Sequence, residues 1–189
     1  MKLREKIFGC VLLVVATVTA WRILTPRDDV KFVATIVDER PAPSFQLLDQ
    51  NGRPVQLEGY LHRHRIVLIF FDGRNGLNGN SILEWIRKFA PAIKQTGVRL
   101  IAISTPLTPE FKSQAESFPF PVLHDTWSGQ PGSCSVKWGT AILPAKDSVA
   151  TIKPAIFVIE RTGLVEWDGD TPKPVNDPEL FLTQLITGS

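Results

Sequence analysis

Hydrophobic residues gather in three short runs, and each has the length of a buried strand. Residues 66–71 read Ile-Val-Leu-Ile-Phe-Phe without a polar break, and residues 98–104 and 155–160 are also largely apolar. A run of branched and aromatic residues is typical of a strand covered on both faces by other elements. We therefore expect these runs to form the centre of one sheet.

Helical patterns separate the runs. Ser81 followed by Glu84 indicates a capping box, and Thr108-Pro109-Glu110 and Asp177-Pro178-Glu179 are typical helix starts. The side chains expected on the inner side of the first helix are Ile82, Trp85, Ile86 and Phe89. Those expected to cover the sheet from the last helix are Leu180, Phe181, Leu185 and Ile186. A single helical turn is predicted at residues 135–138.

Turn signals complete the element order. Asn51-Gly52 joins two short strands, 44–48 and 54–57, into a hairpin at the edge of the sheet. Residues 120–123 predict another short strand, and residues 164–168 should pair back on the third apolar run. Alternation of buried strands with helices predicts an α/β fold with a mixed sheet between helices.

The N-terminal segment has the pattern of a membrane leader. Three basic residues (Lys2, Arg4 and Lys6) precede an apolar run over 7–20 that can be extended to Leu24. Residues 1–24 are interpreted as a membrane anchor; a cleaved signal peptide is the alternative, because Val18-Thr19-Ala20 offers small residues for cleavage. The positive flank predicts that the N-terminus stays in the cytoplasm and that the domain lies on the extracytoplasmic side of the membrane. If the leader is cleaved, the domain is expected to be exported. Residues 25–40 are expected to be a linker and residues 41–189 the folded domain.

Charge and metal-ligand content narrow the function classes. The 189 residues carry 21 basic and 19 acidic side chains, so the charge gives no reason to expect a nucleic-acid partner. Two cysteines, Cys10 in the leader and Cys134, predict no structural disulfide. His62 and His64 share one side of an incoming strand but lack a third ligand, so we expect no metal and no cofactor. His124 is interpreted as a hydrogen-bonded structural histidine.

Several motifs resemble one family. Residues 43–52 match a P-x-F-x-L-x-D-x-x-G hairpin motif. Residues 100–104 and 120–125 resemble a v-a-i-S strand followed by an l-p-f-p-l-l-s-D segment. Residues 154–163 resemble a P-x-T-F-v-I-D-x-x-G motif. In this order they resemble the peroxiredoxin-like (AhpC/TSA, redoxin) family. The resemblance implies a thioredoxin-like fold, with a mixed central sheet, helices on both faces and an N-terminal β-hairpin.

The resemblance also implies where chemistry belongs. Family members carry the reactive cysteine in the loop after the first buried strand, here residues 72–80, but this loop contains no cysteine. A hydroxyl or amide does not replace a thiolate, which is ionised and strongly nucleophilic near neutral pH. The resemblance further implies that Pro154 has a cis bond and faces this loop. The candidate binding residues are Asp72, Arg74, Asn75, Asn78, Asn80, Trp127 and Pro154.

Three functions stay open at this point. The leading hypothesis is a membrane-tethered, redox-inactive module that binds a protein partner at the altered loop. The alternative is a thiol-dependent antioxidant oxidoreductase or peroxidase that uses Cys134, assisted by Lys137 one turn away. A third is a small-ligand binder in the cysteine-free pocket.

Overall fold

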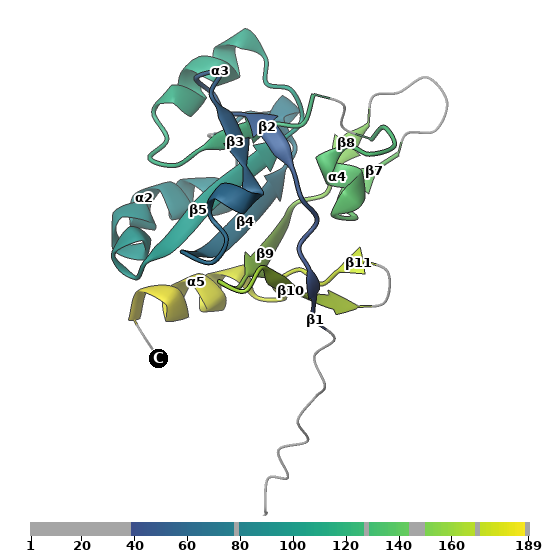
Figure 1. The fold of residues 1–189 in the computed structure, drawn as a ribbon. Coiled ribbons are helices and arrows are strands. Elements are labelled where there is room, and N and C mark those ends of the chain that lie inside the picture. The colour runs from purple at the N-terminus through teal and green to yellow at the C-terminus, as the bar shows by residue number, and fades with distance from the viewer. Residues whose placement is uncertain (1–38, 78–79, 127–128, 144–149, 169–170, 188–189) are drawn as a thin grey trace, which may run out of the picture. The chain divides into compact units, whose positions relative to one another are not determined.

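The fold was analysed in a computed structural model, which describes residues 39–77, 80–126, 129–143, 150–168 and 171–187 (Figure 1). The strands are β1 (Glu39–Pro41), β2 (Gln46–Leu48), β3 (Pro54–Gln56), β4 (Arg65–Phe71), β5 (Val98–Ser104), β6 (Val122–His124), β7 (Ala141–Ile142), β8 (Thr151–Ile152), β9 (Ala155–Ile159), β10 (Leu164–Asp168) and β11 (Thr171–Pro172). The helices are α2 (Ser81–Gln95), α3 (Pro109–Glu116), α4 (Cys134–Lys137) and α5 (Pro178–Thr187), with short 3-10 turns η1 (Leu57–Gly59) and η2 (Gly73–Asn75). Within these ranges no helix combines the length and the hydropathy that a membrane crossing needs.

The strands form one mixed sheet in the order β1-β10-β9-β4-β5-β6-β2-β3, with β11 beside β10 and with β7 and β8 as a separate pair. The three apolar runs predicted as buried strands are β4, β5 and β9, and they lie next to each other. β4 pairs in parallel with β5 and antiparallel with β9. The predicted hairpin is β2–β3 at one edge, and β10 pairs back on β9 as expected.

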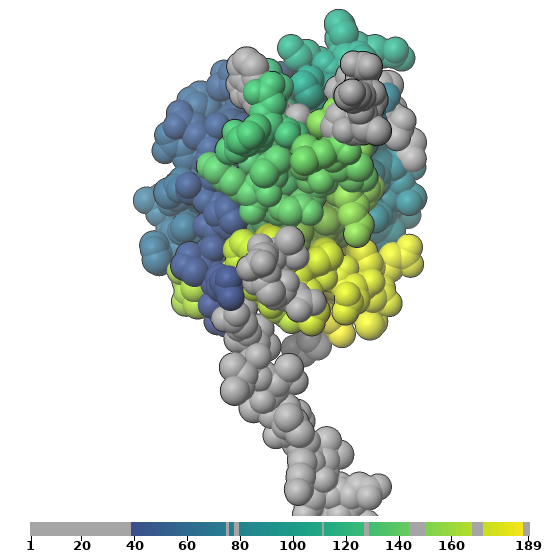
Figure 2. Space-filling model, turned by 90° about the vertical axis from the view of Figure 1, so that its right-hand side faces the viewer, coloured from purple at the N-terminus to yellow at the C-terminus, as the bar shows by residue number. Residues whose placement is uncertain are grey.

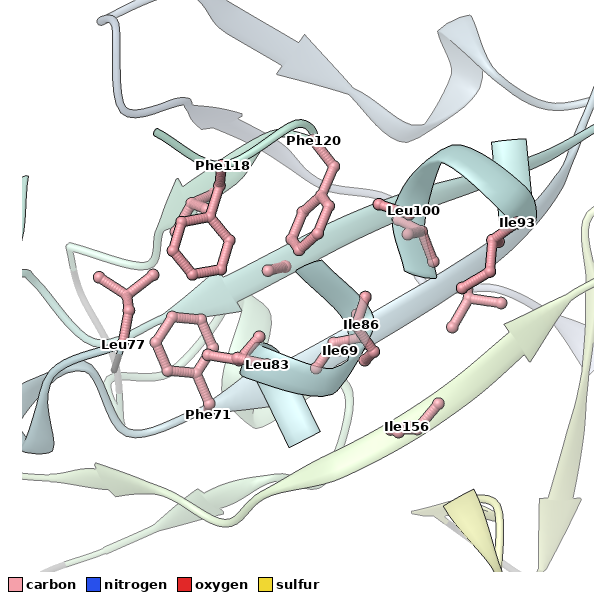
Figure 3. Close-up of a cluster of buried hydrophobic side chains, with 14 of the residues drawn as sticks. Ile69, Phe71, Leu77, Leu83, Ile86, Ile93, Leu100, Phe118, Phe120 and Ile156 are labelled. Atoms are coloured by element: carbon pink, nitrogen blue, oxygen red, sulfur yellow. The ribbon is translucent and has the colours of Figure 1, made fainter. Parts of the chain in front are cut away.

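Alternation along β4 divides the core into two clusters. Val67, Ile69 and Phe71 enter the cluster that α2, α3 and α5 cover. The intervening residues of β4 enter the opposite cluster. Successive side chains of a strand point to opposite faces, so an unbroken apolar run needs cover on both. Figure 3 shows side chains from α2 and from the sheet packed together in the first cluster.

The helices cover the two faces unequally. The second face has the single turn α4, the β7–β8 pair and the β2–β3 hairpin in place of long helices. Trp138 is fully buried and holds α4 on this face, with ring centroids 5.9 Å from Phe70 and 5.2 Å from Phe157. Figure 2 shows residues of α4, β7 and β8, in green, gathered in the centre of this side of the molecule.

Three helix predictions need correction. The N-cap of α2 is Asn80 and not Ser81, because the Asn80 amide oxygen accepts the first free backbone N–H groups of the helix. In α5, Leu180 is 56% exposed while Leu182 is buried, because the helix turns Leu182 and Leu185 toward the sheet. The buried stripe of α2 is Leu83, Ile86, Ala90 and Ile93, while the predicted Ile82, Trp85 and Phe89 pack at its border.

Three pairings were not expected from the sequence. β1 begins at Glu39, two residues before the expected start of the domain, and pairs antiparallel with β10. β11 pairs with the end of β10, and β7 pairs with β8. Each pairing involves only two or three residues, and so short a segment is not long enough to show the alternation of polar and apolar residues that predicts a strand. The predicted leader, residues 1–24, lies outside the described residues.

Candidate functional site

The altered loop begins where the central strand β4 ends. Phe71, the last residue of β4, lies opposite Ser104, the last residue of the parallel strand β5. The next residues of each strand, Asp72 and Thr105, are therefore neighbours, and the Thr105 hydroxyl donates to the Asp72 carboxylate at 3.2 Å. Thr105 was missed by sequence reasoning. The signal was available, because the carboxyl ends of adjacent parallel strands meet at one edge of a sheet.

Asp72 and Arg74 form a closed ion pair. Arg74 Nε donates to both carboxylate oxygens at 3.0 and 3.2 Å, and its Nη2 donates at 2.7 Å. Burial alone would raise the pKa of Asp72, but the hydrogen bonds and charge of Arg74 outweigh it, so the pKa lies below its ordinary value. The cation of this loop is thus already neutralised by a permanent anion. A thiolate-activating site needs the opposite, a cation free to stabilise a developing negative sulfur.

Gly73 allows the loop to pack tightly against the end of β5. Its N–H donates to Thr105 Oγ1 at 2.9 Å in a buried position. A Cβ at this residue would approach Leu107 Cδ2 to 2.6 Å and the Thr105 carbonyl oxygen to 2.8 Å. The η2 turn, which Asn75 closes, then brings Leu77 into the first core cluster.

Asn80 and Pro154, two of the candidate binding residues, lie at the same recess. Both line a recess of about 120 Å³, whose wall also includes Ile82 from the first turn of α2 and Pro174, Val175 and Pro178 from the segment entering α5. The Val175 N–H donates to the Ile156 carbonyl at 2.7 Å, which fixes this segment beside β9. The described side chains that line the recess are apolar apart from Asn80, and its volume is enough for a short aliphatic side chain.

The expected cis bond at Pro154 is wrong. No cis peptide bond occurs within the described ranges, and the Lys153–Pro154 bond is trans. A trans X–Pro bond is favoured by about 0.5–1 kcal/mol unless a turn demands otherwise. Here Lys153 is held by a hydrogen bond from its N–H to the Thr140 carbonyl at 2.8 Å, and Pro154 leads directly into β9.

Cys134 lies on the other face of the sheet. It belongs to the second core cluster, whereas the loop residue Leu77 belongs to the first. Only 5% of Cys134 is exposed. Burial, and then the negative charge of Asp125, raises the pKa of the Cys134 thiol far above its ordinary value, and the opposing effect of Lys137 is smaller. The arrangement is that of a structural cysteine.

Asp125 explains why Cys134 is held there. Its carboxylate accepts the Ser135 N–H at 2.7 Å and the Cys134 N–H at 3.4 Å, and only 1% of Asp125 is exposed. The motif that ends in this aspartate therefore has a structural role: it caps α4.

The remaining candidates do not converge on the loop. Asn78 and Trp127 lie outside the described residues. His124 is half-buried, and neither ring nitrogen has a hydrogen-bond partner in the described part of the chain, contrary to the expected hydrogen-bonded histidine. Burial, followed by the charge of Lys112, lowers the pKa of His124 although Asp49 opposes this. Groups of three or more metal-ligating side chains are absent from the described ranges.

Comparison with known proteins agrees with this architecture. The model of the AhpC/TSA family matches residues 39–168. The chain belongs to the AhpC/TSA family. It is 28% identical over 147 residues to the alkyl hydroperoxide reductase E of Mycobacterium tuberculosis and of Mycobacterium bovis, covering 76% of this chain and 92% of theirs. The resemblance derived from the sequence motifs is thereby confirmed.

Several solved structures share the fold. The peroxidoxin BcpB from Mycobacterium tuberculosis superposes with a TM-score of 0.62 at 20% identity, over 79% of this chain and 93% of its own. Peroxiredoxin Q from Xanthomonas campestris gives 0.57 at 15% identity, over 76% and 91%. A thiol:disulfide interchange protein DsbE from Chlorobium tepidum gives 0.52 at 18% identity, over 79% and 95%. The predicted thioredoxin-like fold is thus confirmed.

Proposed function

We propose that this protein is a redox-inactive member of the AhpC/TSA family that binds a protein partner through its altered loop. The observation that carries the proposal is the content of residues 72–80: an aspartate stands beside the arginine, and no sulfur is present. Peroxide reduction requires a thiolate that attacks the peroxide bond. The loop offers no such nucleophile, and its ion pair is already closed.

Cys134 does not replace the missing nucleophile. Attack on peroxide needs an accessible thiolate, and Cys134 is buried with a raised pKa. It is the first residue of α4, which the buried Trp138 holds on the sheet. These properties disfavour the alternative of an oxidoreductase that uses Cys134.

The loop surface has the features of a peptide-binding site. The recess beside Pro154 and Ile82 accepts an apolar side chain. Arg74 keeps 44% of its side chain exposed, and its Nη1 forms no hydrogen bond with the described residues. A partner with an aliphatic side chain would fill the recess, and a carboxylate or carbonyl oxygen of the partner would accept from Arg74.

Redox inactivity is tested with the purified full chain. Consumption of hydrogen peroxide and of an organic hydroperoxide is measured with dithiothreitol as reductant, for the wild type and for Cys134→Ser. We expect both proteins to remain at the uncatalysed rate. Turnover in the wild type that disappears in Cys134→Ser would refute the proposal.

Partner binding is tested by site-specific photocrosslinking in the cells of origin. A photoreactive phenylalanine replaces Glu84, an exposed residue in the first turn of α2, and in a matched control replaces Glu116, which is exposed at the end of α3. We expect one discrete adduct from position 84 that Arg74→Ala weakens, and none from position 116. Equal labelling from both positions, or insensitivity to Arg74→Ala, contradicts binding at the loop.

We also propose that residues 1–24 tether the domain on the extracytoplasmic side of a membrane. The support is the basic flank followed by the apolar run over 7–20. Alkaline carbonate extraction should leave the full chain in the membrane pellet and release a variant lacking residues 7–20. An alkaline phosphatase fused after Ser189 should be active only with the apolar run present. Full release of the intact chain, at its full length, would show that no anchor is retained.

A further inference from the structure

A second cavity lies at the opposite end of the sheet from the altered loop. It has a volume of about 550 Å³ and lies between the C-terminal half of α2, the start of β5 and the segment that leads into β6. The altered loop adjoins the carboxyl end of β5, and seven strand residues span about 20 Å. The two places are therefore independent, and the inference below does not rest on the function proposed for the loop.

The hydrogen-bond ladder between β5 and the segment that leads into β6 stops at this cavity. Ala102 donates its N–H to the Pro121 carbonyl at 3.0 Å, and Ser104 accepts the Asp125 N–H at 2.9 Å. Backbone groups alternate between the two edges of a strand, so the N–H and C=O of Leu100 point to this same edge. The next partners in register would be Pro119 and Pro121.

This ladder cannot continue at Leu100. Pro121 has no N–H to donate to the Leu100 carbonyl. Among the backbone bonds of the described residues, none joins the Leu100 N–H to the Pro119 carbonyl. Leu100 is only 7% exposed and lines the cavity. A donor and an acceptor in so enclosed a position need a partner from outside the strand, since an unpaired buried group is costly.

The side chains around this edge combine apolar surface with positive charge. The apolar part includes Ala90, Val98, Leu100 and Phe120, all less than 9% exposed. Figure 3 shows Leu100 and Phe120 near each other, beside the helix that carries Ile93. Two cations, Lys94 and Arg99, line the cavity together with His64 and Tyr60, and no aspartate or glutamate is among the described residues of the lining.

The cations are available for a ligand. In the described part of the chain, the ion pairs join other residues and leave Lys94 and Arg99 without a carboxylate. The volume is within the range of about 300–1,000 Å³ that small-molecule sites occupy. A peptide in strand conformation fits less well. Between the first residue of β5 and the part that is hydrogen-bonded to β6, only Leu100 has both its N–H and its C=O facing this edge.

We propose that this cavity binds a small amphipathic carboxylate, an anion with a short aliphatic or aromatic body. The body would lie against Phe120 and Ala90. The carboxylate would accept from Lys94, Arg99 and the Leu100 N–H, which lack such partners among the described residues. The Leu100 carbonyl cannot accept from an anion and would accept from a water molecule in the cavity. Charge-assisted hydrogen bonds of this kind are the strong contacts in such sites.

The experiment uses 4-phenylbutyrate as probe on the ¹⁵N-labelled, detergent-solubilised full chain. Amide shifts report the position of binding, and their concentration dependence reports the affinity. The double variant Lys94→Gln/Arg99→Gln removes both cations. The matched control Arg53→Gln/Lys112→Gln makes the same charge change at exposed residues outside the cavity. The neutral 4-phenylbutyramide, tested on the wild type, controls for apolar binding and for partition into detergent.

We expect 4-phenylbutyrate to shift the Leu100 amide, and the cavity double variant to weaken binding by about tenfold or more, as the loss of charged hydrogen bonds implies. The control variant should keep its affinity within twofold, and the amide analogue should bind about tenfold more weakly. An unmoved Leu100 amide at millimolar 4-phenylbutyrate would overturn the proposal. Equal weakening in the two double variants, or equal binding of the neutral analogue, would also overturn it.

Discussion

Replacement of Gly73 by alanine should destabilise the loop between β4 and α2. The added Cβ would lie 2.6 Å from Leu107 Cδ2 and 2.8 Å from the Thr105 carbonyl oxygen. The leucine side chain can rotate, but the carbonyl belongs to the backbone next to β5 and cannot. Relief therefore requires movement of the loop, which also lengthens the buried hydrogen bond from Gly73 N–H to Thr105 Oγ1.

The size of the effect follows from these two contacts. Overpacking costs about 1–3 kcal/mol, and a weakened buried hydrogen bond adds about 1 kcal/mol. Together these give about 2–4 kcal/mol of lost unfolding free energy, or a decrease in Tm on the order of 10 °C for a domain of this size. Gly59→Ala is the matched control, because a Cβ there meets no atom within 4 Å. Alanine at that position should be neutral or stabilise by up to about 1 kcal/mol.

Urea unfolding followed by tryptophan fluorescence measures both variants. Gly73→Ala should shift the transition midpoint to lower urea with an unchanged slope, because the surface exposed on unfolding is the same. If the unfolding free energy of Gly73→Ala lies within about 0.5 kcal/mol of that of Gly59→Ala, the close packing of the loop against β5 is incorrect.

Three further predictions concern single side chains. Asn80→Ala should lower the unfolding free energy by about 1 kcal/mol through loss of the α2 cap, whereas Thr108→Ala, at a cap without a side-chain hydrogen bond, should change it much less; urea titration compares them. The stability that the wild type gains over Asp72→Asn should be present at pH 7. The pKa of Asp72 is lower in the folded state than the ordinary 3.8, so this gain should decrease once the pH falls below 3.8 and vanish below the folded pKa. Urea unfolding of both proteins at pH 7 and at pH 3 tests this. An equal difference in unfolding free energy at the two pH values contradicts the ion pair. Iodoacetamide at pH 7.4 should alkylate Cys134 only after denaturation, as read from the Cys134 peptide by mass spectrometry; labelling of the native chain would show that the thiol is accessible.

The sequence predicted the central elements because their patterns are long. The apolar runs of β4, β5 and β9 have five to seven residues, and the family motifs fixed their order. The strands β1, β7, β8 and β11 escaped prediction because two or three residues carry no period. The α2 cap was misplaced by one residue, since asparagine and serine both cap helices and only geometry decides which accepts the N–H groups.

The site was predicted in part, for physical reasons that differ between residues. Asp72 and Arg74 directly follow the buried strand β4, so the local sequence was enough to assign both to the loop after it. Thr105 is 33 positions from Asp72 and becomes its partner only through the parallel pairing of β4 with β5. The isomer of the Lys153–Pro154 bond depends on the residues around it. The family resemblance implied a cis bond, whereas the bond is trans.

The position of β4 has a consequence for protein engineering. It is bonded to β5 along its full length and to β9 from Ile66 to Phe70, so the strand that precedes residues 72–80 is held by backbone pairing and not by the loop. A cysteine-containing segment of equal length, grafted between β4 and α2 with Leu77 and Asn80 kept, would therefore meet an intact scaffold. Such a chimera separates what a cysteine in this loop contributes to chemistry from what the surrounding architecture contributes by itself.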